Sequence, residues 1–262
     1  MRTARHAALS SIVMCTPSTT LAVWTSAWQA GACAPDDLLA ALHAWAPSQF
    51  VLAGDRIGTE STDIGSTELL RLLRNAPGAR LLLPVPGDSR GLPAGSSFAV
   101  AAMTAGEGVL AGSPGSIGVG LVPRHDQHDV LGWAHFTVRV PDTPPIDVGL
   151  GEAEYQMRDA VRTAADALAE LRGPGYPGFD PRREVEVELD RMAYHQYPEK
   201  MSPRARRVLT TADHVAAILT VAERTPAAAP PSAAAQATHA DVTRPLWDAI
   251  RTARVAAAAH AF

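Results

Sequence analysis

Lysine and cysteine are scarce in this chain of 262 residues, and each shortage excludes a kind of chemistry. The single lysine, Lys200, lies in a polar segment that is typical of a flexible surface side chain, whereas arginine is abundant. No Gly-Lys-Ser or Gly-Lys-Thr triplet occurs, so the phosphate-binding P-loop is excluded. Cys15 and Cys33 are too few for a cysteine-rich zinc site or a disulfide framework.

Long apolar runs and a strong excess of positive charge are also absent. No stretch approaches the roughly 18 uninterrupted apolar residues that indicate a membrane-spanning helix. A net charge of -4 and a pI near 6.1 exclude a whole-protein basic surface for nucleic acid. The segment from Met1 to Cys15 resembles a signal peptide only faintly, because Ser10 and Ser11 interrupt its apolar run. We therefore expect a cytoplasmic protein without membrane or nucleic-acid partners.

The composition is that of a folded globular protein, with 47% hydrophobic residues. Charged residues are unevenly spread along the chain: they number 21 in residues 1–150 and 29 in the shorter remainder. The shift falls near residues 145–151, just after a proline-rich segment. We therefore expect an α/β domain over residues 1–150 and a helical region over residues 151–262, with a Pro/Ala-rich linker at residues 225–232.

Short apolar segments alternate with helical patterns in the first part, as in domains with a covered parallel sheet. The pattern predicts a mostly parallel sheet of about four strands with helices between them. The expected strands are residues 49–53, 80–85, 117–122 and 133–140, the last a possible edge strand; the expected helices are residues 35–45, 67–75 and 98–110.

Apolar residues in the second part recur at spacings of three and four, which predicts helices packed on the sheet. Asp180-Pro181 is a capping residue followed by proline, the usual start of a helix. The alternating residues 184–189 leave a strand open as an alternative there. Further helices are expected from Ser202-Pro203 and, at the end of the chain, from residue 241 or 243 to residue 259.

A strand-loop-helix segment after residue 85 is the best candidate for a ligand site. Ligands of open α/β sheets bind beyond the carboxyl ends of the strands, and the start of a helix offers unpaired backbone N–H groups to an anion. The alternative is a capped surface loop in which Arg90 pairs with Asp88. Asp55, after the preceding strand, is expected at the same sheet edge, where two carboxylates are also suited to magnesium. The candidate binding residues are Gly87, Asp88, Ser89, Arg90, Ser96, Ser97 and Asp55.

Glu107 and Asp88 are the weaker candidates for catalysis. Glu107 lies between two glycines near the expected end of the helix 98–110, where an acid opposes the helix dipole. Such local conflicts are common at functional sites, although a solvated helix end explains the residue as well. His125 and His128 supply at most two zinc ligands, so we expect no metal site.

Four runs of residues carry a resemblance to a known family. In these runs the chain resembles an uncharacterised family of high-GC actinobacterial proteins, and the similarity covers most of its length. No activity is known for that family, so the resemblance implies a cytoplasmic bacterial protein and transfers no catalytic residue. The runs are Leu21-Ala22-Val23-Trp24, residues 83–92, residues 105–110 and Gly120-Leu121-Val122-Pro123.

Two hypotheses about function follow from these patterns. The first is a protein that binds an anionic small molecule at the strand-loop-helix segment, with reaction and cofactor unknown. The second is a non-enzymatic interaction or scaffold protein that contacts a protein partner, or a second copy of itself, through its C-terminal helices.

Overall fold

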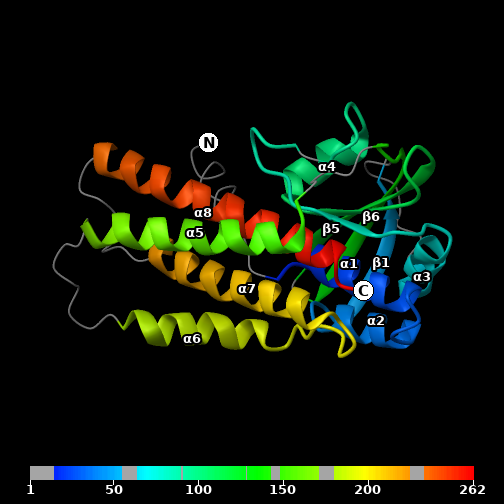
Figure 1. Cartoon of the computed structure of the whole chain (residues 1–262). Coiled ribbons are helices and arrows are strands. Elements are labelled where there is room, and N and C mark those ends of the chain that lie inside the picture. Colours follow the sequence, from blue (N-terminus) through cyan, green and yellow to red (C-terminus); the bar gives the residue numbers. More distant parts are fainter. Residues whose placement is uncertain are drawn as a thin grey trace.

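The computed structural model describes residues 15–54, 64–89, 91–127, 129–142, 148–170, 180–224 and 233–262. A sheet and a layer of long helices lie side by side, and the chain passes from one to the other near residue 150 (Figure 1). Both contribute to one large hydrophobic core, which runs from Val51 and Trp133 of the sheet to Leu209 and Ile250 of the helices. No helix in these ranges is long and apolar enough to cross a membrane.

The strands of the described chain form one mixed sheet in the order β2-β1-β6-β5-β4-β3. Strand β1 pairs with β6 in parallel, and the other four neighbouring pairs are antiparallel. Strand β3, at one end of this order, therefore forms an edge of the sheet. The strands are β1 (Ser48–Ala53), β2 (Ile64–Gly65), β3 (Arg80–Leu82), β4 (Gly108–Ala111), β5 (Ile117–Gln127) and β6 (Val130–Arg139).

The α/β class is confirmed, but the mostly parallel sheet of about four strands is wrong. Strands β4, β5 and β6 follow one another through short turns, and such turns join antiparallel neighbours. A parallel pair needs a crossover of roughly a dozen residues or more. The sequence interpretation also missed β4, because it assigned Val109 and Leu110 to the end of the preceding helix.

Alternation along the strands divides the apolar side chains between two cores. Leu81 of β3 belongs to the large core under the helices α1 (Pro17–Gln29) and α8 (Ala233–Ala259). Leu82, the next residue, belongs to a smaller core that α4 (Ser97–Ala105) covers with Phe98 and Ala102. The helices α2 (Pro35–His43) and α3 (Ser66–Arg74) complete the sheet half.

The second part is built from α5 (Leu150–Glu170), α6 (Pro181–Met192), α7 (Pro203–Arg224) and α8. Helix α5 packs along α8, and α7 contacts both α8 and α6. In Figure 1 the four helices follow one another from top to bottom as α8, α5, α7 and α6. Asp180 caps α6 by accepting from the Arg182 backbone N–H at 3.0 Å, so residues 184–189 are helical rather than a strand. Helix α8 begins before its expected start and contains Pro245. The expected linker at residues 225–232 lies outside the described residues.

Candidate functional site

The predicted anion loop begins with a tight turn that directs Asp88 towards helix α8. Val85 and Asp88 exchange backbone hydrogen bonds of 2.8 and 3.1 Å, and Gly87 takes a φ of +88° between them. The carboxylate of Asp88 then accepts from Nη2 of Arg251 at 2.9 Å. Asp88 thus connects the end of β3 to α8.

The other predicted binding residues have separate local roles or lie outside the described chain. Ser96 is the cap of α4: its hydroxyl oxygen accepts from the Ala99 N–H at 3.0 Å and donates to Pro93 O at 2.8 Å. The sequence placed this cap one residue later, at Ser97, which is exposed. Ser89 is exposed too. Asp55, Arg90 and His128 lie outside the described residues.

Glu107 occupies the link between α4 and β4, not the interior of a longer helix. Gly106 ends α4 in the left-handed conformation, with a φ of 75°, and β4 starts at Gly108. The Ser18 backbone N–H, in the first turn of α1, donates to Oε2 of Glu107 at 2.9 Å. The sequence placed Glu107 inside a helix 98–110, whereas in the structure it follows the end of α4 and contacts the N-terminus of α1.

Burial raises the pKa of the Glu107 carboxyl above its usual range. Hydrogen bonding with Ser18 and Thr16 acts in the opposite direction, as does the nearby His125, but desolvation is the largest effect. The fold therefore shifts this acid towards its neutral form. A neutral carboxyl still accepts the Ser18 N–H through its carbonyl oxygen and has one O–H to donate.

A pocket of about 270 Å³ opens beside Glu107, and we call it the Glu107 pocket. Its walls come from the start of α1, the segment that follows β3, the end of α4, strand β5 and helix α8. It thus lies where the sheet half meets the helical half, a common location for ligand sites. The lining residues are Thr16, Pro17, Trp45, Leu83, Pro84, Val85, Ala105, Gly106, Glu107, Pro123, His125, Arg251 and Arg254.

Two arginines of α8 line this pocket although their side chains are 7% and 1% exposed. Arg251 donates to Leu83 O and Asp88 Oδ2, both at 2.9 Å, and also forms an ion pair with Asp248. Arg254 donates to Asp213 Oδ1 at 2.8 Å. The three aspartates are not themselves lining residues of the pocket. They hold the guanidinium groups in fixed positions from outside its wall.

A polar cluster extends from Asp213 towards the start of α1. Tyr197 donates to Asp213 Oδ2 at 2.7 Å, and burial raises the pKa of this phenol well above its usual value. Burial, together with Asp213, also raises the pKa of the Cys15 thiol to about 12. Cys15 therefore stays protonated at neutral pH and is a poor nucleophile. The cluster is suited to positioning Arg254 rather than to covalent chemistry.

Metal ligands do not gather in the part of the chain that the structure describes: no three His, Cys, Asp or Glu side chains there are close enough to share an ion. The sequence interpretation named Asp88 and Glu107 but missed Arg251 and Arg254. A signal for Arg254 was available, because it follows Ile250 by four residues and therefore lies on the apolar face of the expected last helix. A charged residue on such a face needs a partner, and the partner came from a distant helix.

Comparison with known proteins identifies relatives along nearly the whole chain. The N-terminal domain of Rv1486c-like proteins matches residues 18–148, and their C-terminal domain matches residues 151–255. No solved structure matches the chain.

The similar curated proteins come from mycobacteria. Uncharacterized protein MT1533 of Mycobacterium tuberculosis (strain CDC 1551 / Oshkosh) is 38% identical in an alignment that covers 92% of this chain and 95% of the relative. Uncharacterized protein ML1804 of Mycobacterium leprae is 36% identical, with the same coverage. Uncharacterized protein MAV321 of Mycobacterium avium is 35% identical over 78% of each chain. The chain therefore belongs to the Rv1486c-like family of actinobacterial proteins.

Proposed function

We propose that the protein binds a small anionic molecule in the Glu107 pocket. The observation that carries the proposal is the pair of nearly buried arginines, Arg251 and Arg254, in the wall of one pocket. Guanidinium groups bind carboxylates and phosphates through strong, charge-assisted hydrogen bonds. The pocket begins directly after β3, so the proposed ligand lies next to the predicted loop but contacts different residues.

The charge of the lining supports an anion over a cation. Glu107 is the one carboxyl group among the lining residues, and burial raises its pKa, which shifts it towards the uncharged form. Both arginines are paired with aspartates, but these aspartates lie outside the wall, so the pocket itself presents the guanidinium groups. A bound anion faces these two groups.

The size of the pocket favours a small acid or a sugar phosphate over a nucleotide. Its 270 Å³ is just below the roughly 300–1,000 Å³ of pockets that hold drug-sized ligands. Trp45 and three prolines give it stiff walls.

We also infer a cytoplasmic location, which is supported by the two cysteines: both are free, as is usual in a reducing compartment.

A thermal-shift screen of the whole protein tests the proposal with short carboxylates, sugar phosphates and nucleotides. A ligand that binds only the folded state raises the free energy of unfolding by about 2.7 kcal/mol when its concentration is a hundred times Kd. We expect stabilisation by one of the first two classes and none by amines of similar size. A screen without any stabilising anion would contradict the proposal and would favour an interaction protein that uses its C-terminal helices.

A further inference from the structure

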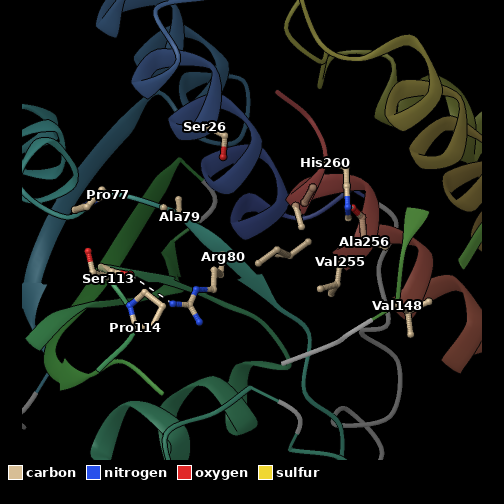
Figure 2. A pocket seen from close by; sticks show the side chains of 15 residues that line it. Ser26, Pro77, Ala79, Arg80, Ser113, Pro114, Val148, Val255, Ala256 and His260 are labelled. Atoms are coloured by element: carbon tan, nitrogen blue, oxygen red, sulfur yellow. Dashed lines mark hydrogen bonds between the residues drawn. The ribbon is translucent and has the colours of Figure 1, made fainter. Parts of the chain in front are cut away.

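A second and larger cavity, of about 580 Å³, lies between the edge strand β3 and the last turns of α8 (Figure 2). Its lining is mostly apolar, with Leu81 on one side and Val255 on the other. Arg80, from the first position of β3, also lines the cavity, and its guanidinium group lies on the side of Ser113 and Pro114 (Figure 2). Because no residue lines both this cavity and the Glu107 pocket, we treat it as a separate site, the Arg80 cavity.

Arg80 is partly buried, and desolvation lowers the pKa of its guanidinium group. Its hydrogen bond to the main chain is long: Nη2 donates to Gly112 O at 3.5 Å. Among the described residues, no carboxylate forms an ion pair with Arg80. A charge that is partly removed from water without a counter-ion is unfavourable, so an anionic group beside it would be stabilising.

Apart from the exposed Ser113, the other polar side chains of the lining already form hydrogen bonds. The Ser26 hydroxyl donates to Ala22 O at 2.9 Å, within α1. Nδ1 of His260 lies 2.8 Å from Ala256 O, a carbonyl that only accepts, so this nitrogen carries the hydrogen. Arg80 is therefore the lining group best able to bind the polar end of a ligand, and the rest of the wall suits an apolar body.

The rim of the cavity is fixed by hydrogen bonds that require no ligand. The side-chain oxygen of Gln29 accepts from Gly78 N at 3.0 Å, and its amide nitrogen donates to two carbonyls of the α3 end. Gly112 N donates to Pro77 O at 2.8 Å. Gly112 has a φ of +137°, and a Cβ there would lie 2.9 Å from Gly118 Cα. The walls are thus preformed, as is usual for small-molecule sites.

We propose that the Arg80 cavity binds an amphiphile with one negative charge, an aliphatic chain that ends in a carboxylate. The carboxylate pairs with Arg80, and the chain lies along the apolar residues of α8. This inference goes beyond the Glu107 pocket, because it concerns other residues and a different class of ligand.

Titration calorimetry of the full chain with decanoate, decanol and decylamine, each below its micelle concentration, tests the proposal. The three share one apolar tail and differ in the charge of the head. We expect decanoate to bind at least about tenfold more tightly than decanol, the effect of one charge-assisted hydrogen bond, and decylamine to bind more weakly still. Equal affinities for decanoate and decanol, or no binding of decanoate at millimolar concentration, would overturn the proposal.

The variant Arg80→Gln separates the head group from the tail. It is expected to lower decanoate affinity to the level of decanol while decanol affinity stays the same. Arg207→Gln, on the exposed side of α7, removes the same charge elsewhere and is expected to change neither. Decanoate binding that is as tight in Arg80→Gln as in the wild type would assign the head group to another residue and reject the inference.

The variant Ala259→Trp fills the cavity from an exposed position of α8, so it leaves the core intact. We expect affinity for decanoate and decanol to fall together, by roughly tenfold or more. Ala193→Trp, exposed after the end of α6, is the matched control. If Ala259→Trp binds decanoate as well as Ala193→Trp does, the amphiphile lies elsewhere.

Discussion

Glu107 shows how one residue couples the start of α1 to the beginning of β4. The burial that raises its pKa means that the folded chain retains a proton which the unfolded chain releases. The stability from this proton is fully present below the ordinary glutamate pKa near 4.5 and is lost as pH rises through the raised value. At neutral pH and above, the carboxyl therefore costs stability.

The variant Glu107→Gln is expected to remove this pH dependence, because its amide oxygen still accepts the Ser18 N–H and carries no titrating proton. Urea unfolding from about pH 5 to about pH 9 measures the effect. The stability of the variant relative to the wild type should rise with pH, at up to about 1.4 kcal/mol per pH unit within the window. Glu186→Gln, at an exposed position of α6, provides the control. Parallel pH profiles for Glu107→Gln and the wild type would show that Glu107 titrates normally.

Single residues were predictable from the sequence only where a local conflict identified them. Glu107 was noticed because glycines flank it and because it opposes a helix dipole, and the structure gives it a role at another helix. Arg80 was assigned only to a strand, since nothing local distinguishes a strand arginine that lines a cavity. That property depends on α8, which is more than 150 residues away in the chain.

Helix α4 shows what decides packing at the scale of elements. It packs against β5 over Gly120, where a Cβ would lie 2.5 Å from Cδ2 of Phe98. The missing side chain thus makes room for the Phe98 ring, which is almost completely buried. Glycine is required here for the close approach of helix and sheet.

The variant Gly120→Ala should destabilise the protein by roughly 1–3 kcal/mol, the usual cost of overpacking a core. Gly65→Ala, in β2, is the matched control because no atom lies within 4 Å of a Cβ at that position. Denaturant midpoints of the two variants give the comparison. A loss of stability in Gly65→Ala as large as that in Gly120→Ala would show that the contact with Phe98 is not responsible.

Most elements were predictable from local pattern, and their pairing was not. Capping residues located the start of α6, and apolar runs located β1 and β3. Strand β4 was missed because Val109 and Leu110 are apolar, like many residues of the preceding helix. In the structure Gly106 ends that helix, and these two residues belong to the strand. The direction of pairing depends on the lengths of the connections, so losing β4 also concealed the antiparallel run from β3 to β6.

At the scale of the whole molecule, both cavities lie where the helical half meets the sheet. Helix α8 contributes residues to each, so both proposed ligand sites depend on the packing of sequences far apart in the chain. The sequence pattern predicted an anion site after β3, next to residues that line the Glu107 pocket. It did not point to the two arginines, because only the packing of α8 brings them there.

The most direct test of the anion proposal adds a charge at the mouth of the Glu107 pocket. Ala105 is exposed at the end of α4 and lines the pocket, so Ala105→Glu and Ala105→Gln differ there by one negative charge at similar size. Titration calorimetry with the most stabilising anion of the thermal-shift screen should give an affinity at least about tenfold lower for Ala105→Glu than for Ala105→Gln. Equal affinities in the two variants would contradict an anion bound between Arg251, Arg254 and Glu107.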